Sequence, residues 1–392
     1  MDLQFGPDET MLRDTVQRFI SQEYGFEQRR RRMAEPDGFC RRTWASMAEL
    51  GLLGVALPAE AGGFGAGAVG TLIVAEAFGS ALVVEPYLGT AVIGAGALEL
   101  GGSAPQRDLL PKIVAGECLL AFAHDEPEMR YDFDSVTTRA TPVAGGFVIS
   151  GRKSPVLHAA AADLLLVSAR VTGDVEPAAV ARVAGEVGPG GAGGLALFLV
   201  ERQAAGVTLT RYVTPDGLPA ADVGLNEVQV AHAASVGEPG AAATLLEHLR
   251  DRASAFLCAE AVGAMDALLT RTIAYLGARQ QFGLPLARFQ ALQHRVADMA
   301  IQVEQARSMA LVAALRANDP NPQQRRKFVS AAKAQVGEAG RIVGEQAVQL
   351  HGGVGMTDAL DVSHFFRRLV TIAQSFGNAD YHVERYLDAA GR

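Results

Sequence analysis

Two short segments in the last third of the chain carry groups that suit an anionic ligand. The first, residues 278–286, reads ARQQFGLPL and contains Arg279, Gln281 and Phe282. Arginine offers a planar fork of N–H donors that matches the oxygens of a phosphate. Alone, this segment is equally typical of an exposed turn.

The second segment, residues 346–355, reads QAVQLHGGVG and contains Gln349, Gly352 and Gly353. Adjacent glycines let backbone N–H groups approach an anion closely, because no Cβ atom stands in the way. Alone, the glycine pair is equally typical of a helix end. Together, in this order, the two segments predict a site for a phosphate-bearing ligand.

A third glycine-rich stretch, residues 184–194, matches a dinucleotide-binding pattern only formally. Gly188, Gly190 and Gly193 have the spacing GxGxxG. That fingerprint requires a helix after the loop, so that the helix N-terminus faces the pyrophosphate. An apolar, strand-like run at residues 195–200 follows instead, and we interpret the stretch as a hairpin loop.

The elements that must position these segments form three consecutive domains. Helical periodicity predicts a helical domain over residues 1–117. Short apolar runs separated by Gly, Pro and Asp predict an antiparallel β domain over 118–238. From 239 to 392, apolar residues recur every three or four positions, which predicts a bundle resembling four helices. The predicted fold class is α+β.

Composition argues against several classes of protein. The 392 residues include 35 Lys and Arg against 43 Asp and Glu, a formal net charge of −8, unlike a general nucleic-acid or membrane-surface binder. Cys40, Cys118 and Cys258 lack disulfide or metal-ligand spacing, and no metal site is expected. No signal peptide and no apolar run of about 18 residues is recognisable. We expect a cytoplasmic protein that contacts neither nucleic acid nor a membrane.

A basic run at residues 29–32 offers a further place for phosphates or for a carboxylate. Charge runs of this length usually form a solvated helix face. We therefore interpret these four arginines as an exposed face.

In order and context, the two anion-binding segments resemble those of the acyl-CoA dehydrogenase family. Residues 51–65 (GLLGVALPAEAGGFG) also resemble the family's N-terminal loop, and residues 110–117 (LPKIVAGE) resemble the entry to its β domain. The resemblance covers nearly the whole chain. It implies the acyl-CoA dehydrogenase fold, with helical, β and helical domains in that order.

The resemblance also implies an FAD-dependent oxidoreductase that desaturates an acyl-CoA thioester. In the family a glutamate takes the α proton, the flavin takes the β hydride, and electrons pass to an electron-transfer flavoprotein. Family tetramers place FAD at a subunit boundary, where the arginine and Gly-Gly segments serve a neighbour's flavin. The residues carried over as cofactor-binding are Arg279, Gln281, Phe282, Gln349, Gly352, Gly353 and Asn378.

Neither position that carries the catalytic base in the family holds a carboxylate here. The usual position, in a Glu-Gly-Thr tripeptide, is occupied by Phe376, and the alternative, counted back from Arg279, by Ala253. Asp251 and Glu260 lie nearby but point elsewhere, since a helix turns about 100° per residue. We interpret both as solvated or salt-bridged side chains. No catalytic residue is predicted.

The β domain departs from the family pattern as well. The family follows Gly-x-Lys with aromatic-Ile-Thr, which contacts the flavin ring, but here Lys153 is followed by SPVLH. The family's Thr-Glu-Pro segment and Gly-Ser-Asp loop are replaced by AHDEPEMRYD at residues 123–132. Three parts of one reaction pocket thus lack the family chemistry, while the segments directed at a neighbour's flavin are kept.

A division of labour between subunits explains this combination. On residues 23–27, 84–88 and 258–265, the chain resembles the small subunit of heteromeric enzymes of the pimeloyl-CoA dehydrogenase type. Such a chain would complete the FAD site of a catalytic large subunit. Two alternatives stay open: an autonomous homomeric tetramer with an atypical base, and a flavin-free structural or binding paralogue. The sequence does not identify the acyl chain of the substrate.

Overall fold

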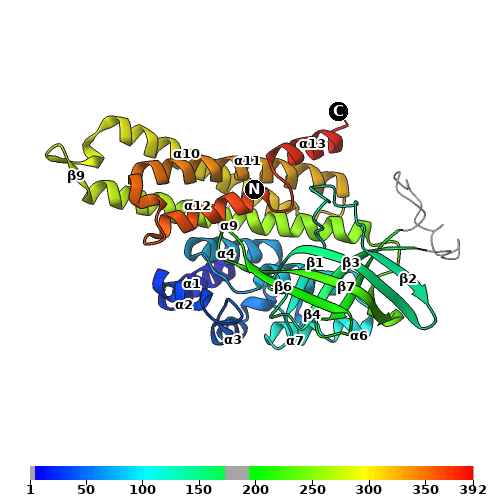
Figure 1. Ribbon diagram of the computed structural model, residues 1–392. Coiled ribbons are helices and arrows are strands. Elements are labelled where there is room, and N and C mark those ends of the chain that lie inside the picture. The colour runs from blue at the N-terminus through cyan, green and yellow to red at the C-terminus, as the bar shows by residue number, and fades with distance from the viewer. Residues whose placement is uncertain (1–4, 173–193, 392) are drawn as a thin grey trace.

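The chain folds into three regions, each formed by a continuous part of the sequence (Figure 1). The computed structural model describes residues 5–172 and 194–391. The long C-terminal helices form an upper layer in this view, and the N-terminal helices and the β sheet lie side by side beneath them.

Short helices build the N-terminal region. They are α1 (Pro7–Glu23), α2 (Phe26–Met33), α3 (Arg41–Glu49), α4 (Gly67–Ala81), η3 (Leu88–Gly94), α5 (Ala95–Gly101), α6 (Ala104–Arg107) and α7 (Leu110–Val114). Helix α4 packs directly on the first C-terminal helix, because a Cβ atom at Gly79 would lie only 1.9 Å from the carbonyl oxygen of Glu260. Glycine at this point therefore allows the two helix backbones to touch.

The arginine run on α2 does not form the exposed face predicted for it. Arg29 and Arg32 are buried, while Arg30 and Arg31 are exposed. The Nε of Arg29 donates to the carbonyl of Leu82 over 2.8 Å. Residues three apart share one side of a helix, so two of the four arginines face the core and the other two face water.

The middle region is one sheet with strand order β6-β7-β3-β2-β4-β5-β8, and β1 pairs with β4. The strands are β1 (Leu120–Ala123), β2 (Arg139–Val143), β3 (Gly146–Leu157), β4 (Leu164–Val171), β5 (Leu195–Glu201), β6 (Val207–Val213), β7 (Pro219–Ala231) and β8 (Ser235–Val236). The predicted antiparallel arrangement needs correction, since β1 and β2 both run parallel to β4. The chain reverses at the β2–β3 hairpin and again before β4, which returns β4 to the direction of β2. The GxGxxG stretch lies outside the described residues.

The described part of the C-terminal region contains five α-helices, a small hairpin and two short 3-10 helices. They are α9 (Ala243–Ala278), β9 (Gln280–Gln281), β10 (Leu284–Pro285), η5 (Leu286–Arg288), α10 (Gln290–Arg316), α11 (Pro322–His351), η6 (Gly352–Met356), α12 (Asp361–Gln374) and α13 (Ala379–Ala389). By length and composition, helix α9 is long and apolar enough to cross a membrane, but 83% of its apolar 18-residue stretch is buried inside the fold. That burial is typical of a core helix, and α9 packs against α4, α10, α11 and α12.

Candidate functional site

A tight hairpin joins α9 to α10 at the outer end of the helical layer (Figure 1). Leu284 pairs with Gln281 across it, and the two turn residues, Phe282 and Gly283, both have positive φ, 56° and 77°. A positive φ is costly for a phenylalanine and is often found at functional positions. Phe282 is also 89% exposed, so packing inside this chain does not account for its conformation.

Arg279 connects α9 to this hairpin and has a free side chain. Its backbone N–H donates to the carbonyl of Tyr275, and its carbonyl accepts from the N–H of Leu286, both over 2.8 Å. Within residues 5–172 and 194–391, its guanidinium makes no hydrogen bond or ion pair. The backbone is thus fixed while all of the side-chain donors remain available.

The Gly-Gly segment lies beside the C-terminal end of α9, which leads into this hairpin. The ring of Tyr275 stacks on that of His351 with centroids 4.4 Å apart, and its hydroxyl donates to the His351 carbonyl over 3.3 Å. His351 ends α11 and immediately precedes Gly352 and Gly353. A Cβ atom added to either glycine would meet nothing within 4 Å. We call residues 279–286 and 349–356 together the hairpin tip.

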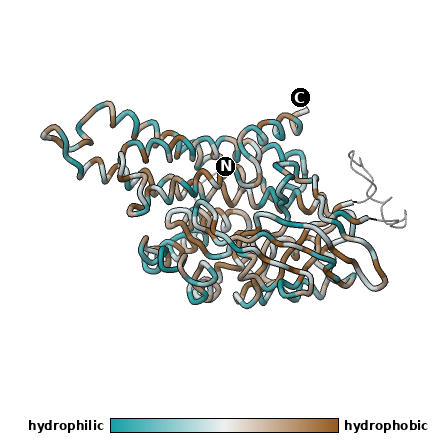
Figure 2. The backbone as a smooth tube through the Cα atoms, in the orientation of Figure 1, coloured by the Kyte–Doolittle hydropathy of each residue, from teal (hydrophilic) through white to brown (hydrophobic). Residues whose placement is uncertain are grey.

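Exposed apolar side chains accompany the free polar groups of the hairpin tip. Leu284 is half exposed and Met356 is 65% exposed, in addition to Phe282. Figure 2 shows apolar residues at the outer end of the hairpin. Aromatic, methionine and arginine side chains on one surface are typical of protein interfaces. The hairpin tip can therefore hold an anion while it contacts another subunit.

Asn378 lies apart from the other six residues predicted to bind the cofactor. It caps the N-terminus of α13, where its Oδ1 accepts from the N–H of Tyr381 over 3.0 Å. Figure 1 places α13 and the β9 hairpin at opposite ends of the helical layer. Within one chain, Arg279, Gln281 and Phe282 follow Tyr275, and Gln349, Gly352 and Gly353 flank its stacking partner His351. Asn378 lies on neither segment.

The two positions at which the family carries its base meet in a packed interior. Ala253 on α9 is fully buried in a hydrophobic cluster that also contains Phe133, with Phe376 packed against it. The rings of Phe133 and Phe376 have centroids 6.3 Å apart. Phe133 belongs to the loop after β1, where the family has small residues. The departures from the family pattern in this loop and at the two base positions therefore lie in one cluster.

An arginine and two tyrosines complete this packing. The guanidinium of Arg250 lies 4.8 Å from the Phe133 ring centroid, and its Nη1 donates to the Tyr381 hydroxyl over 2.6 Å. The Tyr131 hydroxyl donates to Gln374 Oε1 over 2.7 Å. We call Tyr131, Phe133, Arg250, Ala253, Phe376 and Tyr381 the chamber cluster. Sequence reasoning missed Arg250, Phe133 and Tyr381. The bulky residues at 123–132, directly before Phe133, were a signal for that loop only, and no signal pointed to Arg250 or Tyr381.

The nearby carboxylates are held in buried ion pairs. Asp251 contacts Arg325 over 2.9 Å and Arg385 over 2.8 Å. Both oxygens of Glu260 accept from Arg368, over 2.6 and 2.8 Å. The salt bridges predicted for Asp251 and Glu260 are confirmed, but neither side chain is solvated. Both carboxylates are therefore engaged in ion pairs inside the fold.

A buried lysine fixes the loop that carries Phe376. The Nζ of Lys333 donates to the carbonyls of Ile372, Ala373 and Gly377, over 2.9, 3.3 and 3.0 Å. Two of these carbonyls end α12, where a cation is favourable. Burial lowers the pKa of Lys333 to about 8. Phe376 itself has φ 58°, so the ammonium group stabilises a strained loop.

The lysine of the Gly-x-Lys segment is also bound inside the protein. Lys153 Nζ donates to Glu126 Oε1 over 2.7 Å and to Ser168 Oγ over 3.0 Å. Burial lowers the pKa of Lys153 to about 8. Burial acts to raise the pKa of Glu126, but Lys153 and two threonine donors outweigh it and bring that pKa to about 2. In the part of the chain that is described, no group of three His, Cys, Asp or Glu side chains has a metal-binding arrangement.

Three family models match consecutive parts of the chain. They are the acyl-CoA dehydrogenase N-terminal domain at residues 6–117, the middle domain at 121–231 and the C-terminal domain at 240–390. The probable acyl-CoA dehydrogenase FadE25 of Mycobacterium tuberculosis is 31% identical over 331 residues, which are 81% of this chain and 79% of that protein. The benzylmalonyl-CoA dehydrogenase of Aromatoleum aromaticum is 30% identical over 79% of this chain and 78% of its own length.

Solved structures are similar over the full length. A variant of the Tcur3481-Tcur3483 steroid ACAD is 30% identical, with a TM-score of 0.84 and 98% of both chains covered. The ChsE4-ChsE5 complex from Mycobacterium tuberculosis is 26% identical, with a TM-score of 0.84 over 100% of this chain and 99% of that one. The FAD complex of PigA, at 22% identity and a TM-score of 0.87, covers 100% and 99% and shares the fold.

Proposed function

Because the chain belongs to the acyl-CoA dehydrogenase family, whose members are FAD-dependent oxidoreductases, we propose that it is a non-catalytic subunit of a heteromeric enzyme. It would complete the FAD site of a catalytic partner, and the partner would bind and desaturate the acyl-CoA. The observation that carries the proposal is a contrast within one chain. The Arg279 side chain has no partner in the described part of the chain, whereas Phe376 packs on Phe133 where the base would stand.

The hairpin tip fits the phosphate groups of a flavin nucleotide held mainly by another subunit. The Arg279 guanidinium has five N–H donors available, and the open space at Gly352 and Gly353 lets phosphate oxygens come close to the backbone. FAD, when bound, supplies the acceptor for the β hydride. The chain's own contribution would be to hold the anionic end in place through Arg279 and the backbone at Gly352 and Gly353.

The chamber cluster does not fit the other half of the reaction. A proton removed from the α carbon needs an acceptor within hydrogen-bond reach, and the side chains at the two base positions are a phenyl ring and a methyl group. Arg250 stacks on Phe133 and is held by the Tyr381 hydroxyl, so its guanidinium occupies space beside the two base positions. The side chains of the chamber cluster therefore fill the space around the two base positions.

The heteromeric character of the proposal has support from relatives. Two similar structures, at 30% and 26% identity, carry the names of two proteins each. The proposal includes three further points that rest on the sequence and on the family resemblance. They are the pimeloyl-CoA dehydrogenase small-subunit type, an electron-transfer flavoprotein as the electron acceptor, and a cytoplasmic location.

The test is to purify the chain alone and together with the catalytic subunit encoded by a neighbouring gene. The isolated chain should be colourless, whereas the pair should carry FAD that bleaches when acyl-CoA is added without oxygen. Replacement of Arg279 by Ala should weaken FAD retention by the pair about tenfold, as expected for a lost charge-assisted contact. Replacement of Arg107 by Ala, on exposed α6, is the matched control.

Two outcomes would overturn the proposal. Flavin that bleaches in the isolated chain would identify an autonomous dehydrogenase with a base outside the family positions. A pair without flavin, or one whose flavin content ignores Arg279→Ala, would leave the chain as a structural or binding paralogue.

A further inference from the structure

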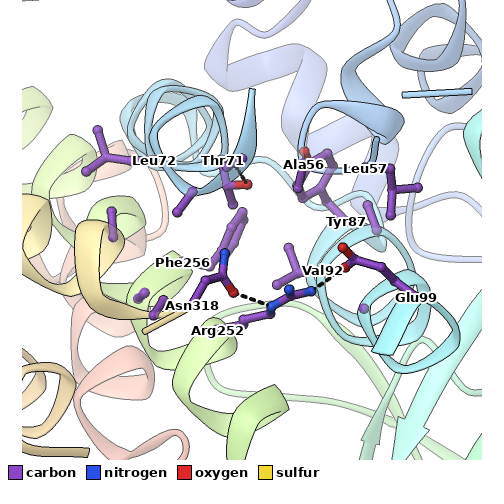
Figure 3. A pocket seen from close by; sticks show the side chains of 17 residues that line it. Ala56, Leu57, Thr71, Leu72, Tyr87, Val92, Glu99, Arg252, Phe256 and Asn318 are labelled. Atoms are coloured by element: carbon purple, nitrogen blue, oxygen red, sulfur yellow. Dashed lines mark hydrogen bonds and ion pairs between the residues drawn. The ribbon is translucent and has the colours of Figure 1, made fainter. Parts of the chain in front are cut away.

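A cavity of about 80 Å³ lies between α4, η3, α5, α9 and the C-terminal end of α10, and it is lined by none of the chamber cluster residues (Figure 3). Tyr87 and Phe256 are buried at its floor, while Ala56 and Asn318 are exposed at its mouth. The cavity is therefore reached from the surface and is separate from the chamber.

The space exists because small residues converge from five helices and from the loop before α4. These residues are Ala56, Gly67, Ala68, Ala91, Gly96, Ala255, Ala314 and Ala317. The larger walls are fixed in place and do not turn inward to fill it. Tyr87 stacks on Phe256 with centroids 5.5 Å apart, and its hydroxyl donates to the Leu52 carbonyl over 2.8 Å. The result is a rigid, mostly apolar pocket.

One guanidinium supplies the polar side of the cavity. Arg252 donates through Nη1 to Glu99 Oε2 over 2.6 Å and through Nε to Asn318 Oδ1 over 2.7 Å (Figure 3). Its Nη2 has no acceptor among the residues that the structure describes. A Cβ atom at Gly96 would lie 3.1 Å from Nη1, so glycine there leaves room for the guanidinium. Arg252 is thus held in position with donors to spare.

We propose that this cavity binds a small neutral molecule with an apolar body of about four to six carbon atoms and one carbonyl or hydroxyl oxygen. The oxygen accepts from Arg252 Nη2, and the apolar body fills the space between the alanines and Phe256. Glu99 already balances the charge of Arg252, so a carboxylate would place a second negative charge beside it. This inference is independent of the function proposed above.

Cyclopentanone and cyclopentanecarboxylate, which share a ring, are suitable probes for the full-length chain. Ligand-observed NMR should show cyclopentanone binding at least tenfold more tightly than the carboxylate. Replacement of Ala255 by Leu places a side chain in the cavity and should weaken cyclopentanone binding at least tenfold. Replacement of Ala274 by Leu, exposed on the same helix, should leave binding unchanged.

The double variant Arg252→Met/Glu99→Met removes the donor and its counter-charge together and should weaken ketone binding about tenfold. If the Ala255 variant fails to fold, Ala91→Val narrows the same cavity from η3 and serves the same purpose. The proposal is overturned if cyclopentanone does not bind the native chain, if the filled variant binds it as well as the native chain does, or if the carboxylate binds equally tightly.

Discussion

The hairpin tip and the chamber cluster are built from the same residue types and differ in what those residues have available. Each contains an arginine and a phenylalanine: Arg279 and Phe282 at the tip, Arg250 and Phe133 in the chamber. Phe282 is almost fully exposed and Arg279 has no partner among the described residues, whereas Arg250 is bound to Tyr381 and stacks on buried Phe133. Donors that are both unpaired and accessible, rather than residue type, therefore mark where a ligand can bind. The Nε of Arg250 also lacks a hydrogen bond, but it is buried.

Truncation of the two phenylalanines should give the largest difference between the chamber cluster and the hairpin tip. Phe133→Ala should lower the free energy of unfolding by about 3 kcal/mol, because it leaves a void beneath Arg250 and Phe376. Phe282→Ala should change it by no more than about 0.5 kcal/mol in the isolated chain. Urea denaturation of both variants measures the difference. Equal losses would mean that the tip is packed or that the chamber is loose.

Acid should lower the free energy of unfolding through His158, a buried histidine directly after β3. The buried Nε2 of His158 donates to the Val84 carbonyl over 2.8 Å, and burial lowers its pKa to about 4. The unfolded chain binds this proton near pH 6.5, so stability is present above pH 6.5 and is lost as the pH falls toward 4. The loss from this group should reach up to about 3 kcal/mol.

His158→Asn should reduce the slope of unfolding free energy against pH between 6.5 and 4. His294→Asn, at the exposed start of α10 beside the hairpin, is the control and should leave the slope unchanged. Denaturant titrations at several pH values measure both. An unchanged slope in the His158 variant would show that other buried groups account for the acid sensitivity.

Lys333 offers a way to loosen the chamber without altering the rings. Lys333→Met should lower the free energy of unfolding by about 2 kcal/mol, because three backbone carbonyls lose their donor. Hydrogen exchange at residues 375–378 should accelerate, since the loop that carries Phe376 is no longer held. Lys112→Met, on the exposed face of α7, should do neither. Unchanged exchange in the Lys333 variant would exclude this role.

The smallest expected effect separates two neighbouring glycines of the tip. Gly352 has φ 66° and ψ −151°, a conformation almost restricted to glycine, and Gly353 does not have a positive φ. Gly352→Ala should therefore cost about 1 kcal/mol, and Gly353→Ala about 0.5 kcal/mol or less, since neither methyl group meets a neighbour. Thermal unfolding measures both. Equal costs would show that backbone conformation does not distinguish the two positions.

Much of the organisation could be predicted from the sequence, because it depends on local patterns. Helical and strand periodicity gave the three regions, and the family's motifs gave the tip residues. The same local reasoning failed for Arg29 and Arg32, which it placed in water. A run of like charges says nothing of which face of α2 meets Leu82 and Asp216, and those contacts come from distant parts of the chain.

By itself, the sequence determined which groups are present: a guanidinium beside a Gly-Gly segment, and no carboxylate at positions 253 and 376. The folded chain adds that Arg279 has no partner among residues 5–172 and 194–391, that Arg250 is bound to Tyr381, and that Asn378 lies far from the hairpin. The physical reason is that availability depends on contacts between side chains more than a hundred positions apart, as Arg250 and Phe133 are. Residue spacing along a chain does not record these contacts.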